Sequence, residues 1–249
     1  MKKLSLVITL LLVLAFGFFF FAPAALLDTW FLHKNNSVLR LSNTEGSLWS
    51  GEGQIIVHLP GAEGLKLPKA HWRVSPIAAL TGRISGRLSA ADGSLSADFD
   101  AVQGGQHLRE VKLKMPMTSL AMALMLSALS PEGETTLAFP QLSIQNGVPA
   151  GEGDLLWQNA SLFLPNTSKR LNLGDVRAHL SLSANGMSFV ISNQGGQARL
   201  SGMGSISGAR ATQLDLAIVP TEDLGADIQV ALAQLGRSEA GGGFKISKP

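Results

Sequence analysis

Hydrophobic and polar residues alternate along most of this chain, in short runs separated by glycine, proline or asparagine. In the clearest run, LSADFDA at residues 95–101, every second residue is apolar and the intervening residues are serine or aspartate. This alternation is typical of a strand with one face in a core and the other in water. The pattern predicts further strands at about residues 38–41, 54–59, 71–74, 83–90, 111–115, 135–139, 141–145, 176–184, 188–192, 198–206, 214–218 and 244–246.

Turn signals lie between these runs, and they favour antiparallel pairing of neighbouring strands. Asp92-Gly93 and Asn185-Gly186 are dipeptides that favour tight hairpin turns. The block TEGSLWSGEG at residues 44–53 predicts a strand, a glycine-bulged turn and a second strand. The sequence therefore predicts a mainly β fold with a few short helices and an antiparallel, strongly twisted sheet. We prefer one continuous sheet to two separate sandwiches.

A loose internal repeat is also visible. The tripeptide Gly-Glu-Gly occurs at residues 51–53 and again at residues 151–153, each time close to a Leu-Trp pair. The match suggests two loosely repeated halves, at about residues 40–130 and 131–249, within one β-rich domain over residues 28–249. We expect the two glutamates to be solvated turn residues.

Three segments depart from the strand pattern and predict helices. Ser75 is a good N-cap, Pro76 suits a first helical position and Gly82 suits the end, which predicts a short helix plugging the end of the sheet. Residues 118–129 are apolar nearly all round, which favours a buried helix of about three turns. A membrane-lying helix is less favoured because the segment has no charged face. Residues 221–235 carry apolar positions at helical spacing.

The N-terminal segment is the strongest hydrophobic signal in the chain. Residues 4–25 contain no charge, and a stretch of about 20 apolar residues can cross the roughly 30 Å hydrocarbon core as a helix. The two lysines at positions 2 and 3 place residues 1–3 in the cytoplasm by the positive-inside rule. Trp30 and Phe31 suit an interfacial aromatic belt. We therefore expect a single-pass transmembrane helix, with residues 28–249 on the other side of the membrane.

A cleaved signal peptide is the competing interpretation of the same segment. The sequence APAA at residues 22–25 has the small residues that a signal peptidase accepts. An ordinary hydrophobic region of a signal peptide has about 7–15 residues, and this one is longer. We favour the uncleaved anchor, although both interpretations export the domain.

Composition removes several function classes. The 249 residues include no cysteine, which excludes disulfides, cysteine metal sites and a lipoprotein anchor. The formal net charge is +2 and no basic run follows the first residues, so nucleic-acid binding has no electrostatic basis. The five histidines lack metal-ligand spacing, and no G-x-S-x-G motif occurs. We therefore expect no enzyme, no catalytic residue, no cofactor and no metal, and we expect Trp49, Trp72 and Trp157 to be core residues.

Three blocks in order, after the apolar segment, resemble the type II secretion system protein N family. They are G-x-L-W-x-G at residues 46–51, W-x-V-x-P-x-x-x-L-x-G at residues 72–82 and GGQARLSG at residues 195–202. The resemblance covers essentially the whole chain. It implies a bitopic inner-membrane protein of a Gram-negative bacterium with a periplasmic domain, and it brings no catalytic residues. The motif positions that it marks as structural or interaction determinants are Gly46, Trp49, Gly51, Gly53, Trp72, Pro76 and Gly82.

The resemblance implies an accessory role in the export of folded proteins, through contacts with inner-membrane subunits or the outer-membrane secretin. Exposed sheet edges could add strands from such a partner. The alternative is a lipid-binding or lipid-transfer groove of the AsmA-like type, and a periplasmic hydrolase would need a clustered polar site that we do not find. A groove would leave the inner face of the sheet open, whereas an interaction module would bury it under the helices. The residues that distinguish the two are Leu95, Phe99, Leu113, Leu180, Leu182 and Leu216.

Overall fold

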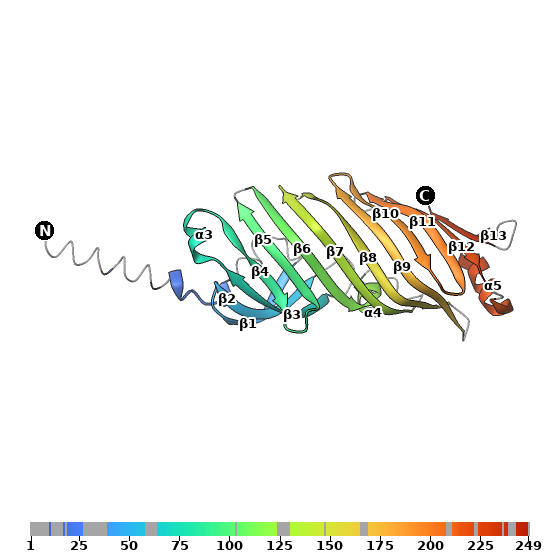
Figure 1. The fold of residues 1–249 in the computed structure, drawn as a ribbon, viewed down its shortest axis with the longest axis horizontal. Coiled ribbons are helices and arrows are strands. Elements are labelled where there is room, and N and C mark those ends of the chain that lie inside the picture. Colours follow the sequence, from blue (N-terminus) through green and yellow to red (C-terminus); the bar gives the residue numbers. More distant parts are fainter. Residues whose placement is uncertain are drawn as a thin grey trace.

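A computed structural model gives the fold of the chain (Figure 1). The residues that the structure describes are 10, 17, 19–26, 39–57, 64–102, 104–123, 130–146, 148–164, 169–207, 211–221, 224–235, 237–238 and 243–248. They form one antiparallel sheet of fourteen strands, which pair in chain order except that β13 lies outside β14. The expectation of a mainly β fold with one continuous antiparallel sheet is confirmed.

The strands become longer toward the middle of the sheet. Their bounds are β1 Leu39–Gly46, β2 Ser50–Val57, β3 Leu65–Val74, β4 Ile84–Ala90, β5 Leu95–Val102, β6 Gly105–Pro116, β7 Pro131–Gln145, β8 Val148–Phe163, β9 Arg170–Ser183, β10 Gly186–Gln194, β11 Ala198–Ser207, β12 Ala211–Pro220, β13 Arg237–Ser238 and β14 Phe244–Lys248. The helices are α3 Pro76–Leu80, α4 Met117–Ala123 and α5 Gly225–Leu235.

The alternation in the sequence separates an apolar inner face from a polar outer face. On β9, Val176, Ala178 and Leu180 are buried, whereas Arg177 and His179 between them are exposed. Cross-strand pairing carries this separation from strand to strand, because residues that pair directly lie on the same face. The same division holds on β5, where Leu95 and Ala97 are buried and point to the inner face.

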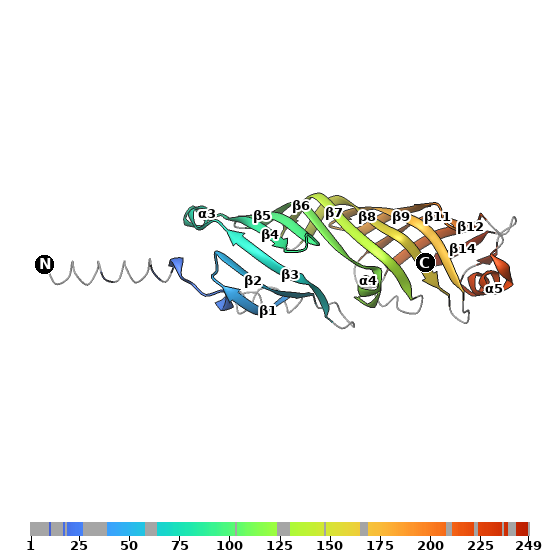
Figure 2. The same ribbon diagram turned by 60° about the horizontal axis from the view of Figure 1, so that its bottom comes forward.

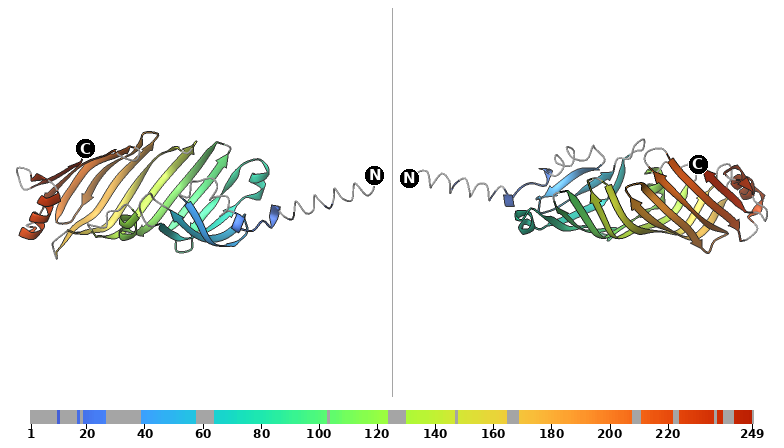
Figure 3. Two further views of the ribbon diagram at one scale, coloured as in Figure 1. Left: turned by 180° about the vertical axis from the view of Figure 1, so that it is seen from behind. Right: turned by 90° about the horizontal axis from the view of Figure 1, so that it is seen from above.

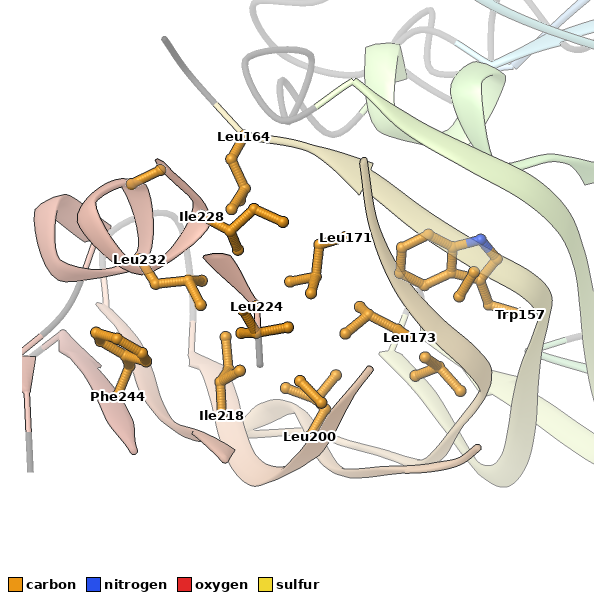
Figure 4. Packing of buried hydrophobic residues seen from close by; sticks show 14 residues of the cluster. Trp157, Leu164, Leu171, Leu173, Leu200, Ile218, Leu224, Ile228, Leu232 and Phe244 are labelled. Atoms are coloured by element: carbon orange, nitrogen blue, oxygen red, sulfur yellow. The ribbon is translucent and has the colours of Figure 1, made fainter. Parts of the chain in front are cut away.

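The C-terminal strands curve around the largest core cluster. Figure 2 shows β11, β12 and β14 lying behind β8 and β9, as a strongly curved sheet requires. Leu171 and Leu173 of β9 and Leu232 of α5 are almost completely buried in this cluster. Figure 4 shows α5 closing the cluster from one end, with Ile228 and Leu232 directed into it. The helix predicted over residues 221–235 is therefore confirmed as α5, which begins four residues later.

The capping signals of α3 are confirmed, but its expected place is wrong. The Ser75 side chain accepts a hydrogen bond from the Ala78 backbone N–H at 3.3 Å, and Pro76 opens the helix. However, Ile77 and Leu80 are 76% and 68% exposed, so α3 does not plug the sheet. In a helix of five residues, most backbone N–H and C=O groups lack a partner within the helix. Because these groups need water, α3 lies at the surface with its apolar side chains exposed.

The helix α4 lies against the inner face, on the same side of the sheet as α5 (Figure 3). It contacts β3, β6 and β7. Ala121 is 1% exposed but Met122 is 64% exposed, so the expectation of burial on all sides is wrong for the described part of this helix. Residues 124–129 of the predicted helix lie outside the described residues.

Two local predictions shift when strands pair. The predicted strands at residues 135–139 and 141–145 are one strand, because β7 continues through Pro140. Pro140 lies at an irregularity in the pairing with β8, where no ladder hydrogen bond is needed.

The hairpin between β9 and β10 turns at residues 184–185, since Ser183 pairs with Gly186. The turn therefore lies one residue earlier than the Asn-Gly signal predicted, and Gly186 opens the next strand with φ +122°.

Among the described residues, none of the helices is both long enough and apolar enough to cross a membrane. Residues 4–9, 11–16 and 18 of the predicted anchor lie outside this part of the chain, as do residues 1–3, Trp30 and Phe31. The described residues 19–26 lie beside β1 and β2, where they contact the sheet.

Candidate functional site

The G-x-L-W-x-G block forms a seat for the C-terminal end of the apolar N-terminal segment. The Leu48 backbone N–H donates to the Ala22 carbonyl at 2.8 Å, and the Ala24 N–H donates to the Gly46 carbonyl at 3.2 Å. Both alanines are buried, at 5% and 1% exposure. The turn between β1 and β2 thus gains backbone hydrogen bonds from a segment more than twenty residues earlier in the chain.

Trp49 strengthens the same contact with its side chain. Its Nε1 donates to the Phe19 carbonyl at 2.7 Å, and the two rings lie 4.7 Å apart between centroids. Its own carbonyl accepts from the Val74 N–H at 2.7 Å, at the end of β3. Trp49 therefore links the N-terminal segment to the β1–β2 turn, in which it lies, and to the end of β3.

Trp72 lies flat across the glycines of β2. A Cβ added at Gly51 would lie 2.6 Å from the Trp72 ring, and one added at Gly53 would lie 3.4 Å from it. The Trp72 Nε1 donates to the Ser47 carbonyl at 3.1 Å, which ties the ring to the β1–β2 turn. Gly46 has φ +92° in that turn, and a Cβ there would lie 2.6 Å from the Ser50 carbonyl oxygen. Gly51 and Gly53 must be glycine because the Trp72 ring lies where their side chains would be, and Gly46 must be glycine because of its positive φ.

The structure thus brings five of the seven motif positions together. Gly46, Trp49, Gly51, Gly53 and Trp72 surround the β1–β2 turn. The remaining two, Pro76 and Gly82, begin and follow α3, and Gly82 has φ +77°. The three tryptophans expected in the core, at positions 49, 72 and 157, are between 6% and 9% exposed, which confirms that expectation.

A polar depression of about 430 Å³ lies beside this seat, mostly over the outer face of β2, β3 and β4. Glu52 accepts a hydrogen bond from Lys69 and lies 3.1 Å from Nδ1 of His71. The hydrogen bond from Lys69 holds the pKa of Glu52 below its ordinary value, and the same bond raises the pKa of Lys69. Charges of both signs therefore line a surface that water reaches.

The motif residues Gly46, Gly51 and Trp72 line this depression, but the sequence predicted neither the depression nor the arginines in it. Arg73 and Arg87 line it together with Ser89. The sequence does indicate that these residues lie on the polar face, because Arg87 and Ser89 stand at alternate positions of one strand and alternate positions share a face. That signal does not show which outer-face charges gather around a hollow, since this depends on the curvature of the sheet.

A histidine also lies next to the second Gly-Glu-Gly segment, where it pairs with Asp154, the residue that follows the segment. His179 Nδ1 lies 2.9 Å from Asp154 Oδ1 on the outer face of β8 and β9. The hydrogen bond with Asp154, with a smaller contribution from Glu152, raises the pKa of His179 above its ordinary value of 6.5. The pair therefore stabilises the fold at low pH, and this contribution is lost as pH rises through the folded-state pKa.

We expect Asp154→Asn to lower the pKa of His179 toward 6.5, because the amide no longer favours the charged ring. An NMR titration of the His179 ring protons measures this value in the full-length protein. Asp175→Asn, a matched change elsewhere on the outer face, should leave it unaltered. An unchanged His179 pKa in the Asp154 variant would contradict the proposed pairing.

The inner face is the other candidate site, and the helices cover it only in part. Leu95 and Leu180 are buried, at 5% and 9% exposure. The other four residues chosen to distinguish a groove from an interaction module are half-buried, namely Phe99, Leu113, Leu182 and Leu216. The described part of the chain therefore has an apolar surface between its helices that water still reaches.

Within the described residues, no group of three or more His, Cys, Asp or Glu side chains is arranged to hold a metal ion. No curated protein and no solved structure matches the chain. A family model described as type II secretion system (T2SS), protein N, matches residues 37–247. This match covers most of the 249 residues and all the strand pairings described above. The chain therefore belongs to the type II secretion system protein N family.

Proposed function

We propose that this protein is an accessory component of the type II secretion system that works through protein contacts in the periplasm and not through catalysis. Residues 4–25 anchor it in the inner membrane, with the N-terminus in the cytoplasm. The family match over residues 37–247 is the observation that carries the proposal. The chain contributes binding surfaces to the machinery, in contact with other secretion subunits.

The motif residues have a mechanical role in this proposal. Gly46, Trp49, Gly51, Gly53 and Trp72 hold the end of the anchor against the first strands, so that anchor and sheet keep one orientation. The support comes from the hydrogen bonds of Trp49 to Phe19 and of Leu48 to Ala22. A domain held close to the membrane meets other membrane subunits at a high effective concentration.

The polar depression over β2, β3 and β4 is the contact surface that we assign to a secretion subunit. It lies beside the motif seat and carries exposed charges of both signs, including Arg73 and Glu45. Complementary charges across an interface favour the correct partner and reject others. A surface at this end of the sheet also lies close to the anchor, where inner-membrane subunits are within reach.

The test is recovery of partners by tagged full-length protein from native membranes, with quantitative mass spectrometry. Wild-type protein should recover other type II secretion subunits, and Arg73→Glu should reduce that recovery about tenfold, equivalent to roughly 1.4 kcal/mol of binding free energy. Arg199→Glu is the matched control, because Arg199 is exposed on the distant strand β11.

The two parts of the proposal fail separately in this experiment. Absence of secretion subunits in the wild-type sample would overturn the assembly role. Equal recovery by both arginine variants would leave the role in place and reject the depression as the contact surface. The open inner face favours a second function, the holding of a lipid, which has its own test below.

A further inference from the structure

A continuous apolar strip runs along the inner face of the sheet, from the N-terminal segment to the C-terminal strands. It begins where Ala24 packs with Leu41 and Trp72, and it continues through the cluster around Ala70 and Leu95. The next cluster joins β6 to β10 through Phe139, Ala178 and Leu180, and the last is the core beneath α5. Apolar clusters thus follow one another along the whole sheet.

The floor of this strip is shaped by rings that lie flat across glycines. A Cβ added at Gly86 would lie 2.7 Å from the Phe99 ring, and one added at Gly204 would lie 2.5 Å from the Phe189 ring. Phe139 covers Gly153 in the same way, at 2.4 Å. Because each ring fills the space of a missing side chain, it does not stand up into the concave side. The floor of the strip is therefore low at these three positions.

Between α4 and α5 the strip is reached by water. Inner-face side chains on β6, β7, β9, β10 and β12 are half-buried, namely Leu108, Val111, Leu137, Leu182, Phe189 and Leu216. Extended apolar patches on a folded surface mark interaction sites. The strip is therefore a binding surface, and its chemistry indicates what it binds.

An extended peptide suits this surface poorly. In the described sheet only β1 and β13 are edge strands, and every strand between them pairs on both sides, so the strip from β6 to β12 offers a peptide no unpaired strand. The backbone amides of a peptide would lie against aliphatic and aromatic side chains without hydrogen-bond partners, which is unfavourable. A hydrocarbon chain has no polar groups to satisfy.

Position and size favour chains that come from the bilayer. The strip begins beside Ala24, at the end of the segment that we propose as the anchor, so its first apolar side chains lie where the chain would leave the membrane. From β6 to β12 there are six strand spacings, which at about 4.8 Å each give roughly 29 Å. One leaflet contributes about half of a hydrocarbon core that is roughly 30 Å thick. The surface is long enough for an acyl chain.

We propose that the inner face between α4 and α5 binds the acyl chains of a membrane phospholipid. The site is independent of the polar depression, which lies on the opposite face, and it does not rest on the secretion role. The apolar floor holds the chains, and the headgroup stays in water at the rim of the sheet.

Photo-cross-linking tests the proposal in the full-length protein within native membranes. The cross-linking residue p-benzoylphenylalanine replaces Phe189 on the inner face or, as a matched control, Val190, its neighbour on the outer face of β10, which is 58% exposed. Irradiation should give phospholipid adducts at position 189 at least tenfold more often than at position 190. Lipids around the anchor contribute equally to both samples.

Other outcomes of this experiment overturn the proposal. An adduct at position 189 with another protein would assign the strip to a partner helix, and an adduct with this chain itself would assign it to an internal segment. Equal phospholipid adducts at both positions, or none at either, would remove the lipid site. Secretion subunits recovered in the same samples report on the assembly role separately.

A second measurement counts phospholipid bound to purified full-length protein by mass spectrometry of extracted lipid. Leu182→Gln places an amide on the strip and should reduce bound phospholipid at least fivefold, whereas Val190→Gln should leave it unchanged. Circular dichroism verifies that both variants keep the sheet. Equal lipid content in two folded variants would contradict the site, and the cross-linking pair decides the matter if Leu182→Gln does not fold.

Discussion

Replacing Trp72 with alanine is expected to lower the free energy of unfolding by about 3–5 kcal/mol. The indole is 6% exposed, and it fills the space over Gly51 and Gly53 that no side chain of β2 occupies. Its Nε1 also donates to the Ser47 carbonyl. Alanine would therefore create a cavity and remove a hydrogen bond at the same place. Urea unfolding of detergent-solubilised full-length protein, followed by circular dichroism, measures the change.

The loss should be local as well as large, because each strand pairs only with its neighbours in the sheet. Hydrogen exchange should become faster in β1 to β4 and remain slow in β8 to β11. Trp72→Phe is the control, since it keeps a ring over the glycines and loses the bond to Ser47, at a cost of about 1–3 kcal/mol. A Trp72→Ala protein that unfolds at the wild-type urea concentration would show that the ring does not support the seat.

Replacing Leu232 with alanine is expected to cost about 2–5 kcal/mol at the other end of the sheet. Leu232 is 1% exposed on α5, and it packs with Ile218, Phe244 and the rest of the largest core cluster (Figure 4). The cavity would weaken the contact that holds α5 on the curved strands. Faster hydrogen exchange should appear in α5, β12 and β14, with β1 to β5 unchanged.

Val230→Ala is the matched control for this prediction. Val230 lies two residues away on the same helix and is 59% exposed, so its replacement should change the free energy of unfolding by less than about 0.5 kcal/mol. Equal effects of the two alanine variants would mean that α5 does not close the cluster. A global loss of protection in Leu232→Ala would mean that the sheet unfolds as one unit, contrary to the local behaviour expected here.

Local patterns in the sequence predict most of the strands and their faces, but they miss β8 at Val148–Phe163, where Glu152 was expected in a turn and lies in a strand. The alternation at residues 95–101 predicts β5 and its buried side, because successive side chains on a strand point to opposite faces. Ser75 and Pro76 predict where α3 begins, since capping depends on atoms within one turn. The three motif blocks also indicate the family, which the match over residues 37–247 confirms. All these features are local in the chain, so local patterns carry them.

How distant segments use these elements depends on the tertiary structure. The sequence shows only that Trp49 is a large aromatic residue. Its hydrogen bond to the Phe19 carbonyl forms because the N-terminal segment lies against the β1–β2 turn. Pro140 breaks a strand locally, yet pairing with both neighbours carries β7 through it. The flat rings over glycines and the half-open inner face likewise arise between strands. Their positions follow from register and sheet curvature, which involve residues far apart in sequence and leave no mark in any short stretch of it.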